Sequence, residues 1–77
     1  MKSRKVLPSE IIGVYEKELH VGSSTIIIKL KDYMYYMSPL LFRQCLQNKM
    51  NYVTTDHLFE FEYDVLMYIN DKLQNNN

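Results

Sequence analysis

The chain has 77 residues, of which 47% are hydrophobic and 13% aromatic, and its formal net charge is zero. This composition supports a packed core, so we expect one small domain spanning residues 1–77. A single cysteine, Cys45, excludes an internal disulfide, and with His20 and His57 it supplies too few ligands for a structural zinc site. Because no apolar run is long enough to cross a bilayer and no apolar stretch follows the basic start, we expect a soluble, cytoplasmic protein without a membrane segment.

The composition and the placement of charge carry two further expectations. Alanine and tryptophan are absent, and the amino acids with AT-rich codons dominate, which favours an AT-rich genome such as that of a phage or mobile element. Residues 1–49 carry eight basic and four acidic side chains, whereas residues 50–77 carry one and five. A molecule with two oppositely charged parts can attract itself, so a homodimer is one expected form.

The N-terminal part predicts a basic arm followed by a strand. Residues 1–8 contain three basic side chains and end in a proline. Residues 11–21 alternate as a strand would, although Ser9 could also cap a helix over the same range. The β-branched content and Gly13 favour the strand. In that strand, one face would hold Ile11, Tyr15, Leu19 and Val21.

A hairpin is predicted next. Residues 22–24 have the length and composition of a tight turn, and residues 25–31 alternate clearly. One face of this strand would carry Ile26, Ile28 and Leu30, and the other Thr25, Lys29, Lys31 and Ile27. Residues 33–37 either continue this strand past a bulge or form a third one.

Two helices are predicted to complete the domain. Ser38 as N-cap and Pro39 at the first position mark a helix over residues 40–50. Its buried side would contain Leu41, Phe42, Cys45 and Leu46. Residues 58–63 alternate like a strand, but a helical spacing of apolar residues favours a helix over residues 56–73, with residues 74–77 as a frayed tail. The expected fold is therefore α+β: an N-terminal β-hairpin of two or three strands packed on two C-terminal helices.

No catalytic, metal-binding or cofactor-binding constellation is expected. The thiol of Cys45 lies on the apolar side of its helix, where a cysteine behaves as a small hydrophobic residue and not as an activated nucleophile. The chain also lacks a glycine-rich phosphate loop. We therefore expect a protein that is not an enzyme and that has no cofactor.

Binding of another protein is the leading functional expectation. Tyrosine, methionine and arginine are enriched in protein interfaces, and an extended segment at residues 33–37 cannot bury both of its faces. The expected partner-binding residues are Tyr33, Tyr35, Tyr36, Met37 and Arg43. They indicate a small regulator, an adaptor or an inhibitor that docks on one partner protein of unknown identity.

Binding of nucleic acid is the alternative. Its candidate residues are Lys2, Arg4, Lys5, Lys29 and Lys31, which lie in the arm and the hairpin. Tyrosines near these lysines could stack on bases. Against this reading, five acidic side chains follow residue 50, and phosphates would repel them. A nucleic acid is therefore the less favoured partner.

Overall fold

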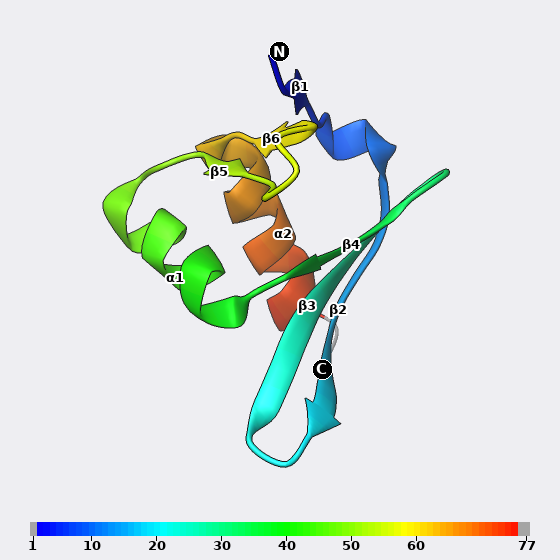
Figure 1. Ribbon diagram of the computed structural model, residues 1–77, viewed down its shortest axis with the longest axis vertical. Coiled ribbons are helices and arrows are strands. Elements are labelled where there is room, and N and C mark those ends of the chain that lie inside the picture. Colours follow the sequence, from blue (N-terminus) through cyan, green and yellow to red (C-terminus); the bar gives the residue numbers. More distant parts are fainter. Residues whose placement is uncertain (1, 76–77) are drawn as a thin grey trace.

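The structure is a computed structural model that describes residues 2–75, and these residues form two three-stranded sheets and two α-helices (Figure 1). The larger sheet is antiparallel, in the order β2-β3-β4, and consists of β2 (Ile11–His20), β3 (Ser23–Leu30) and β4 (Met34–Met37). The smaller sheet has the order β1-β6-β5 and consists of β1 (Arg4–Lys5), β6 (Phe59–Phe61) and β5 (Tyr52–Val53). The helices are α1 (Pro39–Asn48) and α2 (Tyr63–Asn75), and a short 3-10 turn, η1 (Pro8–Glu10), joins β1 to β2. The expected α+β class and three-stranded N-terminal sheet are confirmed.

The β2–β3 hairpin confirms both predicted strands, although Ser23 and Ser24 of the predicted turn belong to β3, and it corrects the predicted faces of the first strand only. Gly22 occupies the turn with a φ of 80°, a conformation that favours glycine. The strand register shifts between Ile11 and Gly13, so Ile12 interrupts the alternation. The predicted apolar face therefore does not stay together: Ile11 packs against the core, whereas the side chains of Tyr15, Leu19 and Val21 are exposed. Val14 is the buried residue of this strand.

Helix α1 begins where its sequence signals place it. The backbone N–H of Leu41 donates to the hydroxyl of Ser38 over 3.3 Å, and Pro39 is the first helical residue. Phe42 is buried, and Cys45 and Leu46 pack against the core while partly exposed. Leu41 was expected to be buried, but it lies on the exposed side of the helix.

The predicted helix over residues 56–73 is wrong in its first third. Residues 59–61 form β6, which lies between β1 and β5, and α2 begins only at Tyr63. The alternation of residues 58–63 was the correct signal, because both Phe59 and Phe61 are buried while Glu60 is half-buried on the other face. Asp56, the first residue of the predicted helix, lies in a turn, where its Oδ1 accepts hydrogen bonds from the Thr54 hydroxyl and the Leu58 N–H.

The expected N-terminal arm belongs to the fold over its described part. Arg4 and Lys5 pair in parallel with Phe59 and Glu60, and the side chain of Val6 is buried. At the other end, α2 continues through Asn75, and residues 76–77 of the expected frayed tail lie outside the described residues.

One hydrophobic core joins both sheets to both helices. Each of these elements except β1 and β5 contributes at least one buried side chain to it. Its members are Val6, Val14, Ile26, Ile28, Leu30, Met37, Phe42, Phe59, Phe61, Val65, Leu66 and Ile69. Both helices pack on the same side of the larger sheet, α2 against β2 and α1 against β3 (Figure 1).

Asn51 connects the loop after α1 to the start of α2. Its Oδ1 accepts a hydrogen bond from the Tyr63 N–H over 3.0 Å, and its Nδ2 donates to the Glu60 carboxylate over 2.7 Å. The first N–H groups of a helix lack partners within the helix, so the Asn51 amide caps α2 from a distance. Replacing Asn51 with alanine is expected to lower the free energy of unfolding by about 1 kcal/mol. Urea denaturation would measure the loss, with Asn48→Ala on the exposed end of α1 as a control expected to change stability by less than about 0.5 kcal/mol. Equal effects of the two substitutions would contradict this role.

Candidate functional site

The register of the larger sheet separates a core face from an outer face. Ile26 pairs with Met37 and Ile28 with Tyr35, and these side chains belong to or pack against the core. Residues between them point to the opposite side, because successive side chains of a strand alternate. The side chains placed on this outer face are Tyr15, Lys17, Thr25, Ile27, Lys29, Met34 and Tyr36. We refer to these seven residues as the outer face.

An apolar row crosses the outer face from strand to strand. Ile27 pairs with Tyr15 on one side and with Tyr36 on the other. Its side chain is only 3% exposed although it is not part of the core, whereas Tyr15 is 42% and Tyr36 is 61% exposed. The two rings therefore flank a buried isoleucine, and this face carries an apolar patch of its own. The exposed Met34 extends the patch along β4.

The charged residues of the outer face are all basic. Lys17 pairs with Thr25, and Lys29 pairs with Gly13 and Met34, so one ammonium lies on each side of the apolar row. The acidic residues of β2 lie on the other face, where Glu16 accepts a hydrogen bond from Ser24 over 3.0 Å and pairs with Arg43 over 3.7 Å. The outer face thus combines exposed tyrosines with positive charge.

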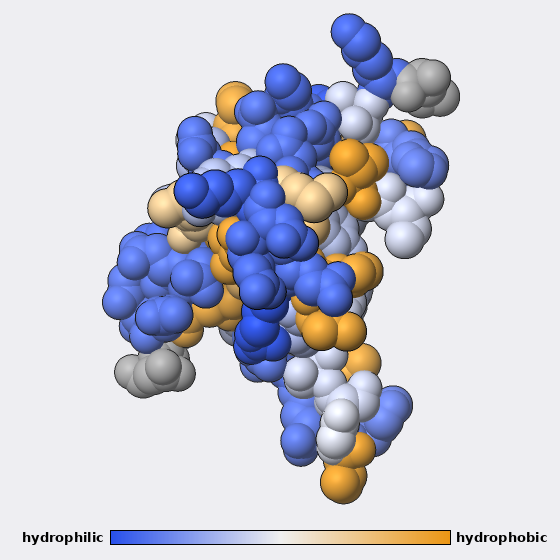
Figure 2. All heavy atoms as spheres, turned by 90° about the vertical axis from the view of Figure 1, so that its left-hand side faces the viewer, coloured by the Kyte–Doolittle hydropathy of each residue, from blue (hydrophilic) through white to orange (hydrophobic). Residues whose placement is uncertain are grey.

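The two sides of the molecule differ in character. Figure 2 shows the side of the molecule on which α1 lies, and hydrophilic atoms dominate there. The β2–β3 hairpin projects beyond the helices, and apolar atoms appear at its end. The turn residue Val21 is 98% exposed there. Neither α1 nor α2 packs on the outer face, since both lie on the opposite side of the sheet.

The five expected partner-binding residues do not form one surface. Tyr33 and Tyr36 are exposed, but Met37 is 1% exposed and belongs to the core. The Tyr35 ring packs edge-on against Phe59, with 4.8 Å between the ring centres. Burial raises the pKa of the Tyr35 phenol, and the nearby charge of Asp56 adds to the rise. Arg43 lies on α1, on the helix side of the sheet, where it pairs with Glu16.

The expected nucleic-acid residues are also divided. Arg4 pairs with Glu10 over 2.8 Å, and Lys5 pairs with Glu62 over 3.5 Å, so acidic neighbours offset both charges. Lys29 belongs to the outer face, and Lys31 lies beside a surface groove that Arg4 and Tyr33 also line. Lys2 is exposed, and no ion pair involves it within the described chain.

Tyr15 and Ile27, which form the apolar row with Tyr36, were not predicted as site residues. Tyr15 was placed on the same face as Ile11, because the register shift at Ile12 leaves no clear trace in the hydrophobic pattern. Ile27 was placed correctly with Lys29 on the face opposite Ile26, yet an apolar residue on a polar face was not read as part of a site. That break in the alternation was the available signal.

The thiol of Cys45 lies in surroundings that keep it protonated. Cys45 is partly exposed, burial raises the pKa of its thiol, and its Sγ lies 3.8 Å from the carbonyl oxygen of Asn51. A raised pKa disfavours the reactive thiolate. Among residues 2–75, no cluster of three His, Cys, Asp or Glu side chains could hold a metal ion.

Asp56 makes the β5–β6 turn sensitive to acid. The hydrogen bond from Thr54, followed by that from the Leu58 N–H, holds the pKa of Asp56 below its ordinary value. A carboxylate whose pKa is lowered by folding stabilises the native state above its ordinary pKa, and this contribution is lost as the pH falls through the folded pKa. We expect the difference in urea midpoint between the wild type and Asp56→Asn to shrink as the pH is lowered from 7 towards 2. A difference that stays constant over this range would contradict the assignment.

Comparison of the chain with protein-family models, with curated proteins and with solved structures found no match in any of the three. Within residues 2–75, neither helix has the length and apolar character required to cross a membrane.

Proposed function

We propose that this chain is a small non-catalytic protein that regulates another protein, as an adaptor or an inhibitor, by docking through its outer face. The main support for this proposal is the row Tyr15–Ile27–Tyr36, which lies on the side of the antiparallel sheet that the helices leave uncovered. Such a sheet usually presents polar side chains on the side opposite the core. Two exposed tyrosines around a desolvated isoleucine match instead the aromatic centre of a protein interface.

The charge of this face favours a partner with acidic side chains around an apolar centre. Lys17 and Lys29 lie on either side of the row, and none of the seven outer-face residues is acidic. Opposite charges at the rim of an interface speed association and select among partners. A homodimer formed through two outer faces would bring lysines against lysines, so we place a different protein ahead of a second copy.

We propose the source and the cellular location of the protein from its amino-acid composition. The codon preference implied by the amino acids favours a phage or another mobile element, and a lone thiol is typical of a cytoplasmic protein. Small regulators that act by docking need no more than a rigid surface of this kind.

Affinity capture with matched variants tests the proposal. The immobilised chain would be exposed to a lysate of the organism that encodes it, in parallel with Tyr15→Ser/Tyr36→Ser and with Leu40→Ser/Met67→Ser. The second pair removes exposed apolar side chains of α1 and α2 and serves as the control. We expect one protein to be retained by the wild type and the control and lost by the outer-face variant. Retention by all three, or by none, would contradict the proposal.

Single-stranded nucleic acid is the second candidate, favoured by the same pairing of tyrosines with lysines. Bases stack on exposed aromatic rings, and lysines beside the rings contact phosphates. Fluorescence anisotropy with labelled rU12 and dT12 at low salt separates the two candidates. Micromolar binding that weakens with salt and with Tyr36→Ser would support the nucleic acid, whereas no change in anisotropy would leave a protein as the partner.

A further inference from the structure

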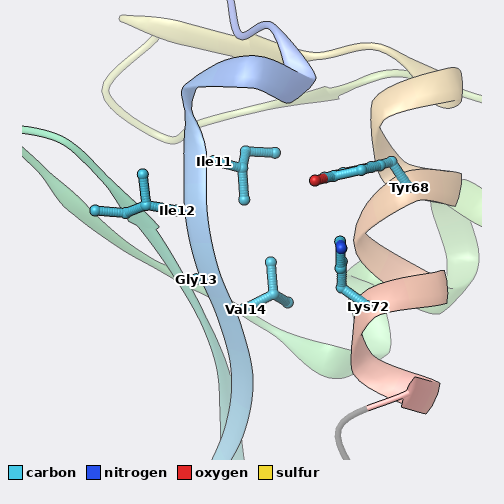
Figure 3. A pocket seen from close by; sticks show the side chains of 6 residues that line it. All are labelled: Ile11, Ile12, Gly13, Val14, Tyr68 and Lys72. Atoms are coloured by element: carbon cyan, nitrogen blue, oxygen red, sulfur yellow. The ribbon is translucent and has the colours of Figure 1, made fainter.

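A hollow of about 260 Å³ lies between the first half of β2 and the last turns of α2. Residues 11–14 form one wall, and Tyr68 and Lys72 form the other. Figure 3 shows the side chains of Ile11 and Val14 directed towards the helix, while Ile12 points away from it. The hollow lies on the side of the sheet that carries α2, so it is separate from the outer face.

Two polar groups are directed into this hollow. Tyr68 and Lys72 are four residues apart on α2 and therefore share one side of the helix. Figure 3 shows the Tyr68 hydroxyl reaching towards β2 and the end of the Lys72 side chain turned towards Tyr68, with 5.4 Å between the Lys72 Nζ and the centre of the Tyr68 ring. Within residues 2–75, neither the ammonium of Lys72 nor the hydroxyl of Tyr68 has a hydrogen-bond or ion-pair partner. The hollow thus offers two donors beside an aliphatic wall.

We propose that the hollow binds an aliphatic carboxylate. The carboxylate oxygens would accept hydrogen bonds from the Lys72 ammonium and the Tyr68 hydroxyl, and the hydrocarbon chain would lie against Ile11 and Val14. The hydrogen bond from the Lys72 ammonium to the carboxylate is charge-assisted and therefore stronger than a bond between neutral groups. Contact with Ile11 and Val14 stabilises the complex further, because it removes the apolar surface of the ligand chain from water.

The charge of the site selects a singly charged anion. A cation would be repelled by Lys72. A multiply charged phosphate would face one ammonium only, together with the neighbouring Asp71 and the negative end of the α2 dipole at Asn75. A free short-chain fatty acid and the C-terminal carboxylate of a chain that ends in an aliphatic residue share the required chemistry.

NMR titration of the full chain tests this site with small probes of known structure. Sodium hexanoate represents the free acid and N-acetyl-leucine the C-terminus of a chain, both at constant ionic strength. We expect saturable shifts of the backbone amides of Gly13, Val14 and Lys72, with a dissociation constant on the order of 1–10 mM. Tighter binding of hexanoate would identify the free acid as the source, and tighter binding of N-acetyl-leucine the chain end.

Two controls make the result specific. Hexylammonium has the same chain and the opposite charge, so it should cause no saturable shift. Lys72→Gln should weaken hexanoate binding by at least about fivefold, whereas Lys49→Gln on the loop after α1 should leave it unchanged. The proposal is overturned if neither carboxylate saturates at tenfold the expected dissociation constant, if hexylammonium produces the same shifts, or if Lys72→Gln binds hexanoate as tightly as the wild type.

Discussion

Replacing Phe61 with alanine is expected to remove a large part of the free energy of unfolding of this domain. The Phe61 side chain is 0% exposed and lies in β6, between the rings of Tyr35 and Tyr52, with centroid distances of 6.1 and 6.4 Å. Removing a buried phenylalanine ring costs about 3–5 kcal/mol, because apolar contacts are lost and a cavity remains. A domain of this length has a total stability of only about 4–12 kcal/mol. Urea denaturation followed by circular dichroism would measure the loss.

The size of this effect follows from the position of Phe61 between the two sheets. Its ring contacts Tyr35 of the larger sheet and Tyr52 of the smaller one. The cavity left by alanine would therefore weaken the packing of the two sheets against each other. Phe61→Leu keeps an apolar side chain in this place and should lose clearly less stability than Phe61→Ala. An alanine variant that loses less than about 1.5 kcal/mol would show that the two sheets do not depend on this contact.

Adjacent tyrosines in β4 are expected to respond in opposite ways to the same substitution. Tyr35 packs against Phe59 and Phe61 on the core face, so Tyr35→Ser should lower the free energy of unfolding by about 2–3 kcal/mol. Tyr36 is exposed on the outer face, so Tyr36→Ser should cost less than about 1 kcal/mol. Partner binding should show the reverse order. Loss of a central aromatic contact weakens an interface by about 2 kcal/mol or more, which is roughly 30-fold in affinity.

The two measurements can be made on the same samples. Thermal or urea unfolding gives the stability of each variant, and surface plasmon resonance against the captured partner gives its affinity. Tyr36→Phe serves as the matched control, because it retains the ring that flanks Ile27. If Tyr36→Ser unfolds the chain, or if it binds as tightly as the wild type, Tyr36 does not act as an interface residue.

Local sequence signals were sufficient for most of the fold. The hairpin and α1 each carry a strong signal, the alternation of residues 25–31 and the Ser38–Pro39 start, and the structure confirms both. Residues 33–37 left two alternatives open, and the structure shows the third strand. Residues 58–63 carried two competing periods, because apolar residues there fit both a strand and a helix. In the structure, residues 59–61 form a strand that pairs with β1, whose residues lie more than fifty positions away in the sequence. Local periodicity does not report such a distant contact.

The candidate site was less accessible to sequence reasoning. Alternation in a strand assigns residues to two faces, but it does not tell which face the helices cover. The aromatic segment at residues 33–37 was identified, yet its members are divided between the core and the outer face. Tyr15 joins Tyr36 only across β3, and its place depends on the register shift beside Ile12, which a single sequence does not reveal.

NMR chemical-shift mapping with the captured partner tests the central claim most directly, because it reports on the backbone amides of all strands and helices at once. The outer face is expected to show the largest changes, centred on Tyr15, Ile27 and Tyr36, with little change in α1 and α2. Changes confined to the helices or to the β1-β6-β5 sheet would contradict the claim that the uncovered sheet face binds the partner.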